Sequence, residues 1–120
     1  MAAVTFTFRR IERTGALDAR VREIAERLRR CDDRITQCHI SVAAGSDDRI
    51  DDPSVAVKIH VSVPGAQVHA ESVQPDGTRH TDVFLALRDA YDSALRQLRD
   101  LQRDGRKSSL LSGVRGSAGR

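Results

Sequence analysis

Arginine dominates the chemistry that this sequence offers. Lys and Arg together number 20, and all of them except Lys58 and Lys107 are arginine. The planar guanidinium group binds a phosphate through two parallel hydrogen bonds, which the ammonium group of lysine does not. A GC-rich genome would produce the same bias. The placement of the arginines therefore decides whether they indicate a nucleic-acid-binding surface.

Basic side chains follow the two segments that we expect to be helical. At about 100° per residue, one edge of the C-terminal helix collects guanidinium groups from Arg88, Arg96, Arg99 and Arg103. The first helix has basic residues on both flanks of its apolar stripe and in its last turn, namely Arg20, Arg22, Arg27, Arg29 and Arg30. Lys58 joins these candidates from a strand. Together they suit contacts to the RNA backbone, although a solvated helix with i,i+4 ion pairs would look similar.

Motifs for other chemistry are missing from the sequence. It contains no G-x-S-x-G, Walker, H-E-x-x-H or G-x-G-x-x-G pattern. The acidic segment AGSDDRIDDPS lacks the spacing and the closing Glu of a calcium loop. We therefore expect no enzymatic activity, no cofactor, no small-molecule substrate and no bound metal.

Three histidines fall on strand positions that should face solvent: His39, His60 and His69. Such a row of imidazoles is able to hold a metal or to add pH-dependent positive charge, but solvated sheet histidines are the simpler interpretation. The four aromatic residues, Phe6, Phe8, Phe84 and Tyr91, all fall on expected core faces. Without exposed aromatic rings, stacking of single-stranded bases is disfavoured.

The segment from Asp82 to Arg103 must position most of the arginines. Its large apolar residues step by three and four along the chain, at Phe84, Leu87, Tyr91, Ala94, Leu98 and Leu101. This spacing predicts an amphipathic helix that covers a core. A similar spacing predicts a first helix over residues 15–30, with Thr14 as its N-cap.

Alternating apolar residues predict strands over residues 4–8, 36–43, 55–63 and 67–73. Pro64-Gly65 suits a tight turn. If these two residues are the turn centre, Val63 faces Ala66, and the outward side pairs Lys58 with Glu71 and His60 with His69.

The predicted order is β-α-β-β-β-α, an α+β fold with a four-stranded sheet. The first two strands should be parallel and the rest an antiparallel meander. Each strand has one apolar face, so both helices should cover the same face of the sheet. We expect one domain over residues 1–104 and a disordered basic tail over 105–120. With no visible secretion signal or membrane span and few cysteines, we expect a cytoplasmic protein with reduced thiols.

This order, the strand ITQCHISV, the turn V-x-V-P-G and the helix DVFLALRDAYDSALRQL together resemble the ribosome hibernation-promoting factor family. That family is also called ribosome-associated inhibitor A or sigma-54 modulation protein. The resemblance covers roughly residues 4–104 and is strongest in the last helix. Many members have Lys where this chain has Ser93 and Asp100, so its last helix is less basic.

The resemblance implies a short, non-catalytic protein that is monomeric off the ribosome. Its partners would be the small ribosomal subunit and ribosomal RNA, contacted through basic residues of both helices. It would occlude the decoding channel and inhibit translation in resting or stressed cells. Two alternatives stay open: a double-stranded-RNA-binding domain that acts on another RNA, and a protein-interaction or metal-responsive module that uses the exposed sheet face.

Overall fold

The computed structural model describes residues 3–45, 54–72 and 80–115, with side chains as far as Arg103. Most of the acidic segment and of the connection before the last helix lies outside these residues. The elements are β1 (Ala3–Arg9), α1 (Gly15–Cys31), β2 (Gln37–Ala44), β3 (Val55–Val63), β4 (Ala66–Glu71) and α2 (Val83–Arg115). The predicted β-α-β-β-β-α order is confirmed.

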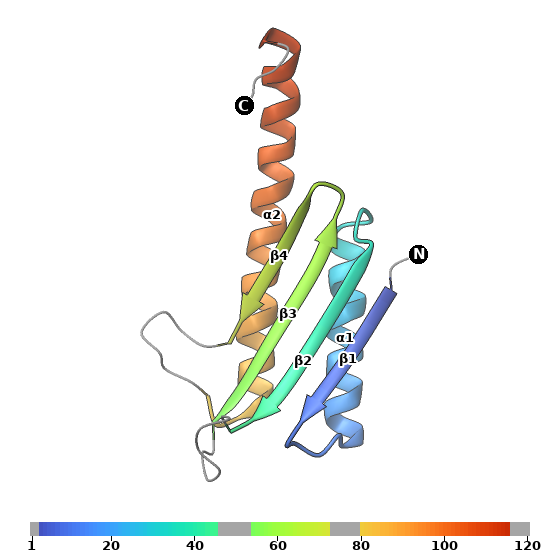
Figure 1. The fold of residues 1–120 in the computed structure, drawn as a ribbon, viewed down its shortest axis with the longest axis vertical. Coiled ribbons are helices and arrows are strands. Elements are labelled where there is room, and N and C mark those ends of the chain that lie inside the picture. The colour runs from blue at the N-terminus through green and yellow to red at the C-terminus, as the bar shows by residue number, and fades with distance from the viewer. Residues whose placement is uncertain (1–2, 46–53, 73–79, 116–120) are drawn as a thin grey trace.

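The sheet has four strands in the order β1-β2-β3-β4. β1 pairs with β2 in parallel, and the two remaining pairings are antiparallel. Figure 1 shows both helices behind the sheet, with α1 near β1 and β2 and α2 near β3 and β4. The α+β fold with both helices on one face is therefore confirmed.

The register of the last hairpin also matches the prediction. Val63 faces Ala66, Lys58 faces Glu71, and His60 faces His69. The turn between the strands places Gly65 at a φ of 82°, which L-residues with a side chain rarely adopt. Thus Pro64 and Gly65 fix the register, and apolar side chains of both strands point to the helices.

Helix α1 begins and packs as its sequence pattern predicts. The backbone N–H of Leu17 donates to Oγ1 of Thr14 at 3.1 Å, which satisfies one of the free donors at the helix start. The predicted stripe is buried, from Leu17 through Val21 and Ile24 to Leu28. It packs in one core with the inner face of the sheet, including Cys38, whose thiol pKa burial raises to about 11.

Asp82 caps the start of helix α2, because the backbone N–H of Phe84 donates to its Oδ1 at 2.9 Å. The buried residues of α2 are Ala86, Leu87, Ala90, Ala94 and Leu98. Tyr91 and Leu101 are only partly buried. The prediction that Phe84 faces the core is wrong, since the residue is 37% exposed. The small alanines let one face of α2 lie close to the sheet, and this turns Phe84 toward solvent.

The C-terminal boundary of α2 differs from the sequence-based expectation. We expected the helix to end at Arg103, whereas it continues to Arg115 and projects beyond the sheet (Figure 1). The segment has no proline to stop a helix, and an interior glycine costs only about 1 kcal/mol relative to alanine. The division into a domain at 1–104 and a tail at 105–120 stays a prediction.

Deleting residues 105–120 should leave the melting temperature almost unchanged. The buried core ends at Leu98 among the residues whose side chains are described, and the end of α2 projects past the sheet (Figure 1). Thermal unfolding of the full and shortened chains, followed by circular dichroism, measures the difference. A decrease of more than a few degrees would mean that this segment packs against the domain.

Candidate nucleic-acid-binding surface

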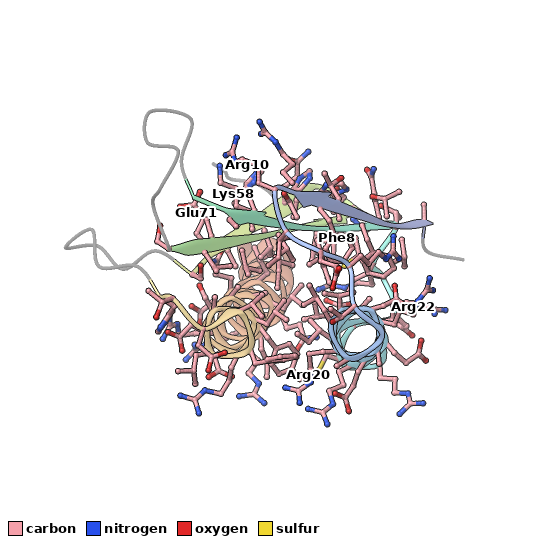
Figure 2. The ribbon with its side chains drawn as sticks, turned by 90° about the horizontal axis from the view of Figure 1, so that it is seen from below. Phe8, Arg10, Arg20, Arg22, Lys58 and Glu71 are labelled. Carbon is pink, nitrogen blue, oxygen red and sulfur yellow. The ribbon has the colours of Figure 1, made fainter. Side chains whose placement is uncertain are left out.

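The predicted basic residues lie on two opposite faces of the molecule. Arg20 lies between the two helices on the side away from the sheet, whereas Arg22 lies on the outer flank of α1 (Figure 2). Lys58 lies across the sheet from the helices, on the same side as Arg10 and opposite Glu71 in the register (Figure 2). The structure therefore places the helical candidates on one layer and separates Lys58 from them.

The arginines of α1 are paired with carboxylates of the same helix. Glu23 binds Arg20 at 3.4 Å and Arg27 at 3.1 Å. Glu26 binds Arg29 and Arg30 at 2.9 and 3.5 Å. All of these side chains are well exposed to solvent, so each pair contributes little to stability. These arginines can still bind a phosphate, but each must first break its ion pair with Glu23 or Glu26.

Asp18 holds two arginines near the edge of the sheet. It accepts hydrogen bonds from Nε of Arg13 and Nε of Arg22, each at 2.8 Å. The hydrogen bond from Arg22, followed by that from Arg13, lowers the pKa of this carboxyl group. Both guanidinium groups also lie over the ring of Phe6, at 5.9 and 5.4 Å from its centroid. Arg22 therefore already contacts Asp18 and Phe6, and a phosphate would have to compete with these contacts.

The α2 arginine line, which we define as Arg88, Arg96, Arg99 and Arg103, is exposed along its whole length. In the described part of the chain, no carboxylate forms an ion pair with Arg88, Arg96 or Arg99. Arg103 pairs with Asp100. The N–H donors of three guanidinium groups on α2 are therefore open to solvent. A phosphate can bind them without breaking an ion pair to a described residue, which makes α2 a better candidate for phosphate binding than α1.

The two helices form a shared surface between their exposed flanks. The guanidinium carbon of Arg20 lies 5.6 Å from the ring centroid of Phe84 on α2. Further along, burial raises the pKa of Tyr91, and the positive charges of Arg27 and Arg99 oppose that rise. Arg20 of α1 therefore reaches Phe84 of α2, and Arg27 of α1 acts on Tyr91 of α2 together with Arg99, although the two helices are far apart in sequence.

The outer sheet face carries the predicted histidine row. His39 pairs in register with His60, which pairs with His69. The rings of His60 and His69 are stacked, with centroids 4.4 Å apart. Hydroxyl groups of Thr5 and Thr7 contact the two ring nitrogens of His39. Within the described ranges, no group of three or more potential metal ligands converges.

Sequence reasoning missed the contact between Arg20 and Phe84. The signal was present in the alanines at positions 86, 90 and 94, which step by four residues along α2. They mark a second apolar stripe beside the one through the larger residues. If both stripes are included in the helical wheel, the predicted buried face of α2 is centred nearer the alanines and further from Phe84.

None of the described helices is long and apolar enough to cross a membrane.

Comparison with known proteins identifies relatives of the chain. The family model described as "Sigma 54 modulation protein / S30EA ribosomal protein" matches residues 4–105. No curated protein matches the chain significantly in sequence.

Two solved structures share the fold. A ribosomal subunit interface protein from Coxiella burnetii superposes with a TM-score of 0.67 and 17% identity, covering 84% of this chain and 98% of that one. The N-terminal domain of Thermus thermophilus Protein Y gives a TM-score of 0.64 and 20% identity, covering 84% and 99%. At these identities the structures establish the fold, and the family match over residues 4–105 establishes kinship. The chain belongs to the sigma 54 modulation protein / S30EA ribosomal protein family.

Proposed function

We propose that this protein binds the small ribosomal subunit and occludes its decoding channel. Translation would then be inhibited in resting or stressed cells, without any chemical step, cofactor or small-molecule substrate. The observation that carries the proposal is the family match over residues 4–105. It is supported by the solved relative from Coxiella burnetii, which is described as a ribosomal subunit interface protein.

Electrostatics supplies the anchoring in this proposal. Arg88, Arg96 and Arg99 are exposed, and binding of each to a phosphate would release counterions from the RNA. The arginines of α1 would add further contacts after their ion pairs with the carboxylates of α1 have broken. The full set of proposed RNA-binding residues is Arg20, Arg22, Arg27, Arg29, Arg30, Lys58, Arg88, Arg96, Arg99 and Arg103.

Two positions reduce the positive charge of the α2 surface. Asp100 pairs with Arg103 at the C-terminal end of the line. Ser93, where many relatives have lysine, forms a hydrogen bond of 3.2 Å with Nε2 of Gln97. The same amide group donates to the backbone oxygen of His69 at 2.8 Å. We therefore propose that Ser93 supports the contact between α2 and β4, while Arg88, Arg96 and Arg99 provide the main affinity for RNA.

The proposal places the protein in the cytoplasm, as a monomer when it is off the ribosome. The sheet holds α1 and α2 side by side, so binding to a folded RNA would require the α1 arginines to leave their ion pairs but no change in the backbone. Steric occlusion requires only that the bound domain overlap the path of messenger or transfer RNA. No residue has to act on a substrate.

In a sucrose gradient at low salt, the protein should co-sediment with small subunits or whole ribosomes, and added salt should release it. The measurement is immunodetection across gradients of lysates from growing and stationary cells. Detection only in the soluble fractions of both lysates would contradict ribosome binding. A cell-free translation assay then separates inhibition from mere association.

A further inference from the structure

An aromatic ring lies on the solvent side of the interhelical surface. Phe84 is 37% exposed and Leu85 is 41% exposed, and they are the large hydrophobic residues that the described part of the chain exposes. Phe84 belongs to the first turn of α2, where its position is fixed by the Asp82 cap. The exposed part of the Phe84 ring is accessible to a ligand from solvent.

Positive charge surrounds this ring. The guanidinium carbon of Arg20 lies 5.6 Å from the centroid of Phe84. Arg20 is held by Glu23 at 3.4 Å, and its side chain remains 46% exposed. Arg88 follows Phe84 by one helical turn on the same helix, so the two side chains are neighbours. Arg88 is exposed and forms no ion pair with a described residue.

We propose that Phe84 stacks against an unpaired nucleobase, whose flanking phosphates bind Arg20 and Arg88. A nucleotide joins a flat apolar ring to an anionic group, and this site joins an exposed ring to guanidinium groups, so the two are complementary. Every base has a face that can stack on an aromatic ring, and arginine planes also stack on bases. The site favours single-stranded RNA, because a duplex keeps its bases inside the helix.

This inference rests on the proposed function in that the ligand is RNA, and it extends that function from backbone binding to a base contact. It also revises the sequence-based expectation that no exposed ring would be available for stacking. A partner protein with an apolar anchor and acidic neighbours is the competing occupant, and the experiment below distinguishes it.

Phe84→Trp provides a direct probe, because the chain contains no other tryptophan. Titration of the full-length variant with a short single-stranded RNA of mixed sequence should quench its fluorescence. The same RNA as a duplex, or inorganic polyphosphate, should bind the arginines and leave the fluorescence nearly unchanged. Equal quenching by all three ligands would overturn the stacking proposal.

Affinity measurements with two alanine variants complete the test. Phe84→Ala should bind the single-stranded RNA roughly 5- to 150-fold more weakly than the wild type, in proportion to a lost stacking contact. Leu85→Ala is the matched control: Leu85 is similarly exposed and also lies close to Arg88 on the helix, but it is apolar without a ring and lies about 100° from Phe84, so its loss should change the affinity by no more than about twofold. Circular dichroism verifies that both variants are folded.

The outcomes separate this inference from the proposed function. Equal affinities of the wild type and Phe84→Ala would reject the base contact and favour a protein occupant, even if the protein still co-sedimented with ribosomes. Conversely, quenching of Phe84→Trp by single-stranded RNA would support the base contact even if no ribosome association were found.

Discussion

Replacing Leu98 with alanine should lower the free energy of unfolding by about 2–5 kcal/mol. Leu98 is 1% exposed and belongs to the core formed by both helices and the inner face of the sheet. The truncation removes buried methyl groups and leaves a cavity that rigid neighbouring strands cannot fill. Urea unfolding followed by circular dichroism measures the loss.

Arg99→Ala is the control for this prediction, because Arg99 is the next residue on α2 but is exposed. Its change should be under about 0.5 kcal/mol. A larger loss for Arg99→Ala than for Leu98→Ala would show that α2 packs with a different face, and the position of the α2 arginine line would then be wrong as well.

Simultaneous replacement of Arg88, Arg96 and Arg99 by glutamine should weaken RNA binding by roughly 500-fold at 0.1 M salt. The estimate follows from the loss of three phosphate contacts, each of which contributes about 0.9 to the slope of log affinity against log salt. The slope itself should become shallower by about three units. Glutamine keeps the helix propensity and removes only the charge. Salt titrations of binding to purified small subunits measure both quantities.

Two further variants sharpen this comparison. The double replacement of Arg22 and Arg29 by glutamine should reduce the slope less per residue, because Asp18 and Glu26 already hold these side chains. Asp100→Lys should steepen the slope, since it adds a charge and also releases Arg103 from its ion pair. If all variants gave the wild-type slope, the exposed edge of α2 would not contact RNA.

Much of the fold could be predicted because local signals agreed with one another. The alternation of apolar residues in β3 and β4, together with the turn at Pro64 and Gly65, permits only one register that buries both apolar faces. That register is observed, from Val63 and Ala66 to Lys58 and Glu71. The position of Thr14 and the stripe of α1 were equally consistent, and both were confirmed.

Other features depended on tertiary context. Whether Phe84 or the neighbouring alanines face the sheet is decided by how closely α2 approaches it, which helical periodicity does not specify. The ion pairs of α1 depend on rotamers, so the sequence could not distinguish Arg20, paired with Glu23, from Arg96, exposed and without an ion pair to a described residue. The continuation of α2 to Arg115 was not predicted, because the Gly- and Ser-rich composition after Arg103 was taken as a sign of disorder.

The candidate surface was only partly accessible to prediction for the same reason. The helical wheel placed Arg88 and Arg99 on one edge of α2, and both are exposed there. The wheel of a single helix could not show that Arg20 would lie beside Phe84, because that contact joins residues of two helices. Proximity between elements became visible only with the sheet that holds them together.

In the proposed complex, the helical layer of this domain faces ribosomal RNA in the decoding channel. Directed hydroxyl-radical cleavage tests it from two positions, Arg96→Cys on α2 and Gln67→Cys on the sheet, each carrying a tethered iron chelate. The exposed Cys31 is replaced by serine in both, whereas the buried Cys38 stays protected. We predict strong cuts in the small-subunit RNA that lines the channel from position 96 and weaker cuts from position 67. Strong cuts from position 67 with none from position 96, or cuts confined to RNA outside the channel, would contradict the claim.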